Sequence, residues 1–360
     1  MKIEAWSAQA VRHRNLDPHW HYAGRTVPDL PGVRIALRSG GFMGEGYATF
    51  LPHLDASPEA LVNTASWIAA GLLGASLTDL EACLLRLGAC EKSRNAGRSA
   101  VEMALLDLGA RAMGLPVARM FAGETRPLQV LRIIPVKSPE DMAEIAGALV
   151  AEGYRALKLK ATGHLEEDEA RIAAVRAAAG ADVTLTVDAN QAYDAENALK
   201  LEAALRPHRI WSLEQPVPAT DRAALAQVRQ GAEARIEADE GLFGLPDLDA
   251  LLAAKAADGI SLKLARSGGF MPSRAMARRA SGAGVYARLG TAFGGPLVTL
   301  ATAALAAVCP TDGPAECAEF THFDDGAHAW PDIRDGLLIP PEEPGFGQVR
   351  TTPWSATWQA

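Results

Sequence analysis

The strongest constraint on the fold is a series of short apolar runs that alternate with helix-sized segments over the last two thirds of the chain. Each run except the last is followed by a stretch long enough for a helix. Strands that alternate with helices predict parallel βαβ units, and eight of them predict a closed barrel of about 200 residues. An open doubly wound sheet is the alternative, but no Gly-x-Gly-x-x-Gly follows any run. The runs span residues 128–136, 155–160, 183–188, 209–214, 235–239, 259–264, 284–289 and 315–320.

The residues before this alternating region have a different pattern. Strand-like segments separated by glycine and proline turns come first, with a hairpin predicted at Ser39-Gly40-Gly41. A helical pattern follows up to Met113, with one apolar face along residues 98–113. We therefore expect an α/β chain with three parts: an N-terminal α+β capping domain at 1–118, a (β/α)7β TIM-type barrel at 119–325, and a C-terminal tail at 326–360 that packs back on the capping domain.

The composition excludes several classes of partner. The chain has 35 basic and 43 acidic residues, a net charge of −8, and no run of lysines or arginines. It therefore lacks the basic patch that nucleic acids and anionic membrane surfaces need. No apolar stretch reaches the length of a membrane span, and the N-terminus lacks the apolar core of a signal peptide. We expect a cytoplasmic protein with reduced cysteines that binds neither nucleic acid nor membrane.

Five ionisable residues lie at the C-terminal ends of five consecutive predicted strands. They are spaced 24 to 28 residues apart, one βα unit each. In a (β/α) barrel these strand ends form the mouth, where active sites are assembled. The five residues are Lys160, Asp188, Glu214, Asp239 and Lys263.

Alternation along the strands indicates that the two lysines face the barrel interior. Lys160 shares its face with Lys158, whereas Leu159 points the other way, toward the outer helices. Because four strands out of eight make half a turn, we expect Lys160 and Lys263 to face each other across the mouth, with the three acids on the arc between them.

Three carboxylates in a largely dry mouth repel one another unless a cation holds them. Oxygen ligands without histidine or cysteine favour Mg²⁺, and Mn²⁺ can take its place. Open positions on such an ion can accept a substrate carboxylate, where it stabilises the enediolate formed when the α-proton is removed. A lysine beside this cation loses its proton more easily, so it can act as a base near neutral pH.

Motifs around these residues resemble the enolase superfamily, specifically the muconate lactonizing enzyme-like subgroup of the mandelate racemase/muconate lactonizing enzyme family. The resemblance covers essentially the whole chain, including the helical segment at 99–123 and the tail at 336–347. Its motifs are Lys158-Leu159-Lys160, Val187-Asp188-Ala189-Asn190, Leu213-Glu214-Gln215-Pro216, Ala238-Asp239-Glu240-Gly241 and Leu262-Lys263.

The resemblance implies a role for each matching position. Arg288 ends the seventh strand, where the mandelate racemase-like subgroup carries a catalytic histidine, and this departure favours the subgroup with two lysines. The implied roles are Mg²⁺ binding by Asp188, Glu214 and Asp239, acid/base catalysis by Lys160 and Lys263, assistance near the substrate carboxylate by Lys158, and support of the metal ligands by Asn190 and Glu240.

Three further observations concern the substrate. Trp20 lies in a loop with His21 and Tyr22 that can cover the mouth, and His322 follows the last run, so we expect Trp20, His322 and Lys158 to bind substrate. Residues 50–51 form a second candidate lid. Residues 291–295 lack the Glu-Ser pair of many subgroup members, and the eighth run lacks the Asp-x-Asp with which dipeptide epimerases hold an ammonium group, so the resemblance leaves the substrate open.

We expect a Mg²⁺-dependent racemase or epimerase that acts beside the carboxylate of a small molecule such as an amino- or imino-acid derivative. Opposed bases suit this reaction, because one lysine removes the proton and the other returns it to the opposite face. The alternative is a lyase or cycloisomerase of dehydratase, lactonizing or succinylbenzoate-synthase type that uses one lysine as base. A third hypothesis is that the barrel only binds a metal and a carboxylate, without catalysis. We expect a homo-oligomer.

Overall fold

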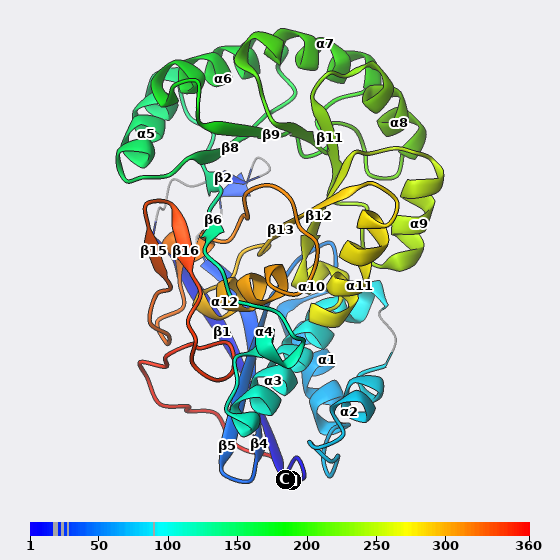
Figure 1. Ribbon diagram of the computed structural model, residues 1–360, viewed down its shortest axis with the longest axis vertical. Coiled ribbons are helices and arrows are strands. Elements are labelled where there is room, and N and C mark those ends of the chain that lie inside the picture. Colours follow the sequence, from blue (N-terminus) through cyan, green and yellow to red (C-terminus); the bar gives the residue numbers. More distant parts are fainter. Residues whose placement is uncertain (17–20, 23–24, 27–28, 89–90) are drawn as a thin grey trace.

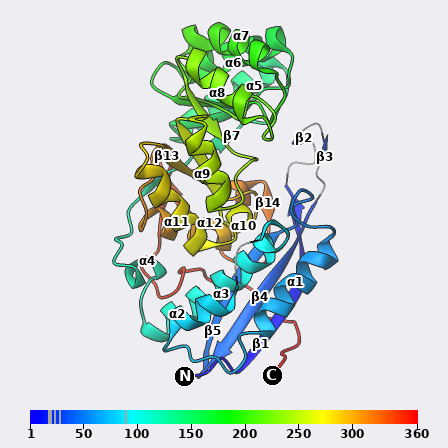
Figure 2. The ribbon, with the colours of Figure 1, turned by 90° about the vertical axis from the view of Figure 1, so that its right-hand side faces the viewer.

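The computed structural model describes the chain outside residues 17–20, 23–24, 27–28 and 89–90. A curled parallel sheet ringed by helices forms the upper part in Figure 1, and an antiparallel sheet with helices against one face forms the lower part. Figure 2 shows the same two parts from the side. The predicted fold class, a TIM-type barrel with an N-terminal α+β domain, is confirmed, whereas the domain limits at 118 and 325 stay predictions.

The parallel sheet keeps sequence neighbours side by side, in the order β13-β12-β11-β10-β9-β8-β7. Its strands alternate in direction of burial: Leu159 and Leu262 pack with the outer helices in one apolar cluster, while the lysines on the same strands face inward. The strands are β7 (Arg132–Ile133), β8 (Ala156–Lys160), β9 (Thr184–Asp188), β10 (Ser212–Glu214), β11 (Arg235–Ala238), β12 (Gly259–Lys263) and β13 (Tyr286–Gly290). The helices are α5 (Pro139–Ala151), α6 (Leu165–Ala179), α7 (Ala195–Leu205), α8 (Arg222–Gly231), α9 (Leu245–Ala253), α10 (Leu264–Ser267), α11 (Phe270–Ser281) and α12 (Pro296–Ala306).

Side-chain caps set where several barrel helices begin. Ser138 accepts a hydrogen bond from the backbone N–H of Asp141, and Pro139 occupies the first turn, where its missing N–H costs nothing. Asp194 and Asp221 cap α7 and α8 in the same way. The loops between strand ends and these caps form one rim of the barrel.

The eighth predicted strand, at 315–320, is reduced to two bridges. In the described chain, Ala315 pairs with Val130 and Glu316 with Gly290, after which the chain enters the 3-10 helix η3 (Glu319–Thr321). Pro314 has no backbone N–H to donate, so the ladder does not extend backwards from Ala315. Because Val130 precedes β7 and Gly290 ends β13, the two bridges still join the edges of the sheet and close the barrel.

The capping sheet has the order β14-β1-β4-β5. Its predicted hairpin turn is present, with φ of 55° at Gly40 and 86° at Gly41. A Cβ at Gly46 would lie 1.9 Å from the carbonyl oxygen of Ala100, so β5 and α3 approach as closely as only glycine permits. The elements of this part are β1 (Ala5–Asn15), β4 (Asp29–Ser39), β5 (Phe42–Thr49), β14 (Phe323–Asp324), α1 (Pro58–Ala70), α2 (Leu80–Arg86) and α3 (Asn95–Met113).

Helix α3 is buried on all sides over residues 95–110, although the sequence predicted one apolar face. It lies between β5 and the short barrel helix α10, which explains the difference. Its polar side chains have buried partners: Arg98 donates to the carbonyl of Gly268 at 2.6 Å, and Asp107 accepts the backbone N–H of Glu45 at 3.0 Å. This helix therefore connects the capping sheet to the barrel.

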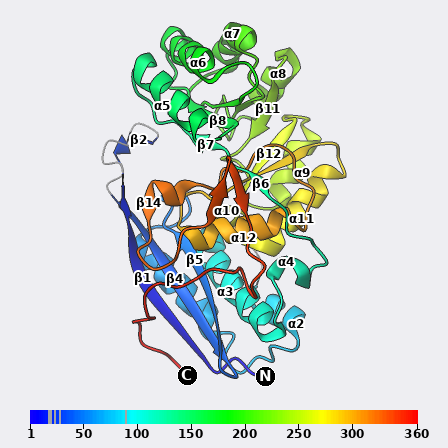
Figure 3. The same ribbon diagram turned by 60° about the vertical axis from the view of Figure 1, so that its left-hand side comes forward.

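The C-terminal segment, red in Figure 3, returns along the capping sheet. Arg350 forms an ion pair with Glu45, and Gln359 bridges to Trp6 of β1.

No helix in the described residues is long and apolar enough to cross a membrane. The remaining short elements are β2 (His21–Tyr22), β3 (Arg25–Thr26), η1 (Lys92–Arg94), α4 (Val117–Met120), β6 (Leu128–Gln129), η2 (Arg206–His208), β15 (Asp332–Arg334) and β16 (Leu337–Ile339).

Candidate active site

Five neighbouring strands carry the predicted ionisable residues to one end of the barrel. Lys160, Asp188 and Glu214 end β8, β9 and β10, and the ladder pairs them in register. Asp239 follows β11, and Lys263 ends β12. Because β9, β10 and β11 lie between β8 and β12, the three acids stand between the two lysines.

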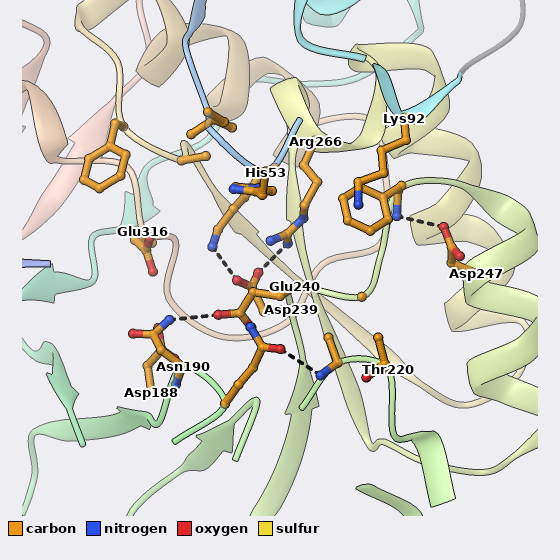
Figure 4. A pocket seen from close by; sticks show the side chains of 18 of the residues that line it. His53, Lys92, Asp188, Asn190, Thr220, Asp239, Glu240, Asp247, Arg266 and Glu316 are labelled. Atoms are coloured by element: carbon orange, nitrogen blue, oxygen red, sulfur yellow. Dashed lines mark hydrogen bonds and ion pairs between the residues drawn. The ribbon is translucent and has the colours of Figure 1, made fainter. Parts of the chain in front are cut away.

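A cavity of about 570 Å³ opens at this end of the barrel. Lys160, Asp188, Asp239 and Lys263 line it. Figure 4 shows the cavity with Asp188 and Asp239 labelled. In that view His53, from the loop after β5, lies beside Arg266 and Asp239. The cavity thus has walls from both the barrel and the capping part.

Lys160 and Lys263 are each paired with the acid next to them. Lys160 Nζ lies 2.6 Å from Asp188 Oδ2 and also donates to Asn190 Oδ1 at 3.0 Å. Lys263 Nζ lies 2.8 Å from Asp239 Oδ2, while Arg266 binds the other oxygen of the same carboxylate. The two lysines therefore approach the cavity from different strands with separate acidic partners.

Lys158 lies beneath the cavity and is fully buried. Its Nζ is 3.0 Å from Asp188 Oδ2, 2.8 Å from Glu214 Oε2 and 2.5 Å from Glu316 Oε2. Two acids at strand ends and Glu316 at an isolated bridge thus surround one ammonium group, which compensates charge at the floor of the site.

Burial and neighbouring charges move the pKa values of these groups in different directions. Burial lowers the pKa of Lys263, but Asp239 and Glu316 outweigh it, so the pKa stands above the ordinary lysine value. For Asp239, burial is outweighed by Arg266 and Lys263, which hold its pKa well below the usual range. Burial raises the pKa of Glu214 to about 8, and Asp188 adds to the rise. A further cation beside Glu214 would favour its charged form.

Unpartnered oxygens support a place for a hard divalent cation. Among the described residues, the buried Oε1 of Glu214 and Oε2 of Glu240 accept no hydrogen bond. Such atoms are costly unless an ion or water satisfies them, and oxygen donors suit Mg²⁺. In the described chain, no three acidic, histidine or cysteine side chains are arranged to hold a metal ion, because each of the three predicted ligands is paired with a lysine or an arginine.

If all are ionised, the buried acids and bases at the floor and mouth of the cavity carry an excess of two negative charges, which such a cation would offset; Lys92, Arg222 and Asp247, on its more exposed rim, are not counted. All of the counted side chains are buried or nearly so. The acids are Asp188, Glu214, Glu237, Asp239, Glu240, Glu316 and Glu319, and the bases are Lys158, Lys160, Lys263, Arg266 and Arg288. The residues present therefore fit the implied Mg²⁺ in donor type and in charge.

Asn190 and Glu240, predicted to support the metal ligands, join the ends of β9 and β11. Asn190 Nδ2 donates to Glu240 Oε1 at 2.9 Å, and the backbone N–H of Asn190 donates to Asp188 Oδ1 at 2.9 Å. Asn190 has a φ of 42°, a left-handed conformation that asparagine adopts more readily than most residues. Both side chains line the cavity, and their supporting role stays a prediction.

Two of the three residues predicted to bind substrate, Lys158 and His322, are not in the cavity wall that the described residues form. Lys158 is under the floor, and His322 follows η3, where its carbonyl accepts the backbone N–H of Leu16 at 2.7 Å. Trp20 lies outside the described residues. From the second candidate lid, Leu51 lines the cavity.

The sequence analysis missed four residues at the site: His53, Arg266, Glu316 and Glu319. Arg266 lies three residues beyond Lys263, in α10, and Glu316 lies near the start of the predicted run at 315–320, so a rule that considers only the last residue of each run does not find them. Glu319 is buried against the hydroxyl of Thr291, and burial, with a further contribution from Glu316, raises its pKa to about 7. His53 comes from the capping part, and its position follows from tertiary packing that no local motif marks.

Two protein-family models match the chain. Residues 5–121 match "Mandelate racemase / muconate lactonizing enzyme, N-terminal domain", and residues 141–350 match "Enolase C-terminal domain-like". The second match spans all five strand-end residues, whereas Ile133 of β7, which also lines the cavity, lies before it.

Similar proteins include epimerases and a cycloisomerase. L-Lys-D/L-Arg epimerase of Methylococcus capsulatus is 30% identical over 353 residues, 94% of this chain and 97% of that enzyme. D-Ala-D/L-Ala epimerase of Cytophaga hutchinsonii is 32% identical over 242 residues, 66% of this chain and 65% of that enzyme. Muconate cycloisomerase 1 of Pseudomonas putida is 30% identical over 296 residues, 80% of this chain and 79% of that enzyme.

Solved structures share the fold. The structure of a dipeptide epimerase from Cytophaga hutchinsonii, complexed with Mg and the dipeptide D-Ala-L-Val, superimposes with a TM-score of 0.92 at 25% sequence identity. The superposition covers 100% of this chain and 99% of that chain.

Proposed function

Because the chain belongs to the mandelate racemase/muconate lactonizing enzyme family of the enolase superfamily, we propose that this isomerase is a Mg²⁺-dependent racemase or epimerase of small carboxylate substrates. One observation carries the proposal: Lys160 and Lys263 line the same cavity from strands that three acid-bearing strands separate. Two bases on different sides of one substrate are what inversion at a carbon requires.

Asp188, Glu214 and Asp239 would hold the Mg²⁺ in this proposal. When bound, the ion supplies positive charge beside the substrate carboxylate, where negative charge grows as the α-proton leaves. Lys158, buried against Asp188 and Glu214, lowers the pKa of both carboxylates and holds them in place. Its role in the proposal is therefore under the site, without a direct contact to substrate.

The lysines remove and return the proton at their Nζ atoms. A base must be a neutral amine, whereas Asp239 and Glu316 hold the pKa of Lys263 high in this structure. A carboxylate that ligates a cation attracts an ammonium group less strongly, so the proposal requires these ion pairs to weaken once the site is loaded. Lys160 is paired with Asp188, so the proposal requires this ion pair to weaken as well.

The acidic side of the cavity supports a substrate that carries a basic nitrogen. Glu316 and Glu319 line this wall, and Glu319 has a hydroxyl, not a cation, as its hydrogen-bond partner. Similar enzymes are named for amino-acid and dipeptide substrates. We therefore place amino- or imino-acid derivatives first among the candidates.

A lyase or cycloisomerase is the second candidate, because a muconate cycloisomerase is also among the similar proteins, with 30% identity over 80% of this chain. In that reaction one lysine removes the proton, and the other contributes only its charge. Incubation of the purified protein with Mg²⁺ and a library of carboxylates in D₂O tests both. Deuterium at the α-carbon together with inversion supports the racemase. An unsaturated or lactone product supports the alternative, and failure to exchange any α-proton contradicts both.

The cytoplasmic location, the homo-oligomeric state and the division into a capping domain at 1–118 and a barrel at 119–325 remain part of this proposal. Sedimentation of the purified protein tests the oligomeric state.

A further inference from the structure

Arg288 of β13 is enclosed inside the barrel, below the cavity. Its side chain is 0% exposed. Nη2 donates to Glu214 Oε2 at 2.6 Å, and Nη1 lies 3.7 Å from Glu316 Oε2. A buried guanidinium is tolerated only where acids compensate its charge. Neither the proton transfer nor the metal ligation described above uses this residue.

Glu237 of β11 holds the guanidinium in one orientation. Arg288 Nε lies 2.9 Å from Glu237 Oε1 and 3.1 Å from Oε2, and Nη2 lies 2.5 Å from Oε1. The hydroxyl of Tyr286 also donates to Glu237 Oε2, at 3.1 Å. Several bonds between two planar charged groups fix their mutual geometry as well as their distance. Nη2 is therefore directed at Glu214.

The two oxygens of Glu214 have different surroundings as a result. Oε2 receives both Arg288, at 2.6 Å, and Lys158, at 2.8 Å. Oε1 is buried and, in the part of the chain that the structure describes, has no hydrogen-bond partner. A carboxylate held in this way by two cations can offer one free oxygen, in a fixed direction, to a further ligand.

We propose that Arg288, fixed by Glu237, is a positioning residue that presents Oε1 of Glu214 to the metal ion. This inference rests on the proposed function, because it takes Glu214 as a ligand of the Mg²⁺. Groups that orient metal ligands typically contribute 10- to 100-fold in metal affinity. The pair therefore affects metal binding itself, before any substrate is present.

The test measures Mn²⁺ affinity from the electron paramagnetic resonance signal of the free ion, with purified protein and no substrate. Glu237→Met combined with Arg288→Met removes both charges, so no buried charge is left unpaired. We expect this double variant to keep its melting temperature within a few degrees and to bind Mn²⁺ about 10- to 100-fold more weakly.

Arg171→Met is the matched control. Arg171 is also an enclosed arginine, with 9% of its side chain exposed, and pairs at 2.5 Å with the buried Asp168. Within the described residues, the carboxylate of Asp168 accepts its other hydrogen bonds from Thr162, Gly163 and Tyr193, and from none of the three predicted ligands. This control should lower the melting temperature and leave Mn²⁺ affinity unchanged.

A double variant that melts like the wild type and binds Mn²⁺ with wild-type affinity would overturn the inference, because the pair would then only pack the barrel. If the double variant does not fold, Arg288→Lys takes its place: it keeps the charge but cannot span both carboxylates. Unchanged Mn²⁺ affinity in that variant would overturn the inference equally.

Glu214→Gln separates this inference from the proposed function. Wild-type Mn²⁺ affinity in Glu214→Gln would remove Glu214 from the metal site and so contradict the proposed function. Weakened binding in Glu214→Gln, together with unchanged binding in the double variant, would contradict the positioning role alone.

Discussion

Asp188, Glu214 and Asp239 can each be tested as metal ligands by removing one charge. We expect Asp188→Asn, Glu214→Gln and Asp239→Asn each to abolish measurable turnover at ordinary Mg²⁺ concentrations, because a hard cation that keeps several waters is weakened by the loss of one charged ligand. Initial rates at saturating substrate check this. Glu196→Gln, on the exposed side of α7, should keep the wild-type rate. Near-normal activity in any of the three variants would remove that residue from the site.

Glu319 is the residue from which we expect substrate preference. At pH 8 to 9 its carboxyl is charged, because its pKa is about 7. Glu319→Gln should then raise KM about tenfold or more for substrates with a free ammonium group, since a hydrogen bond to a charged group contributes roughly 1.5–3 kcal/mol. The same substrates acylated on nitrogen should show no such change. Equal effects on both series would show that Glu319 does not face the nitrogen.

Strand ends explain which site residues the sequence reveals. Lys160 and Lys263 can be predicted from the sequence, because strand periodicity and spacing place them at equivalent positions. His53 cannot be predicted in this way, because its position in the cavity depends on how the capping part packs against the barrel. For Lys158, strand alternation correctly predicts that the side chain points into the barrel. Its position below the cavity could not be predicted, because it depends on the three acids that surround it.

At the scale of elements, periodicity predicted where the strands lie better than it predicted how many residues of each strand pair with a neighbouring strand. The run at 315–320 contains the apolar residues of a strand but pairs only through bridges at Ala315 and Glu316 within the described chain. Likewise, the segment at 98–113 was read as a helix with one apolar face, yet α3 is buried all round. Its polar residues find partners on neighbouring elements, such as the Gly268 carbonyl for Arg98. Such partners are distant in sequence, so local patterns do not show them.

Close contact between β5 and α3 predicts a packing effect at Gly46. Gly46→Ala should destabilise the fold by about 1–3 kcal/mol, the usual cost of overpacking, because the new Cβ would collide with backbone that cannot move freely. Gly147→Ala is the control: apart from the backbone of α5 itself, no atom of the described chain lies within 4 Å of where the new Cβ would be. Because Gly147 lies inside this helix, alanine should stabilise by about 0.5–1 kcal/mol. Urea unfolding measures both. An unchanged free energy of unfolding in Gly46→Ala would contradict the described contact.

His13 of β1 predicts a pH dependence of stability in the capping part. It stacks on Tyr47 with ring centroids 4.6 Å apart, and among the described residues its ring nitrogens have no hydrogen-bond partner. Burial lowers its pKa to about 4; Asp325 and Asp324 oppose the shift, while Arg34 and His328 add to it. Below pH 6.5 the unfolded chain binds a proton that the folded chain excludes. The stability from His13 is therefore fully present above pH 6.5 and is lost as the pH falls to about 4.

The measurement for His13 is the free energy of unfolding at pH 7.5 and pH 5. The wild type should lose about 2 kcal/mol more than His13→Phe between these values. His328, whose pKa is shifted upward, titrates in both proteins, so its contribution cancels in the comparison. Equal pH dependence of the two proteins would mean that His13 is hydrated or protonated in the fold.

For the molecule as a whole, the order of barrel strands and the presence of a separate N-terminal sheet followed from sequence alone. The alternation of strands and helices, with right-handed parallel connections, leaves few ways to arrange these elements. The shape of the cavity did not follow, because loops from the capping part, such as the one that carries His53, complete its walls. The conformation of these loops depends on contacts between distant parts of the chain. Substrate specificity depends on the loops, so it could not be predicted from the sequence either.

The central claim is that two lysines on different sides of one cavity serve the two faces of a substrate carbon. Exchange of the α-proton in D₂O, followed by NMR for each enantiomer separately, tests it most directly. Lys160→Ala should stop exchange from one enantiomer and leave it for the other, and Lys263→Ala should show the opposite pattern. Both variants should lose net inversion, whereas Lys200→Ala, exposed on α7, should behave like the wild type. Full inversion in either single-lysine variant would contradict the assignment of two bases.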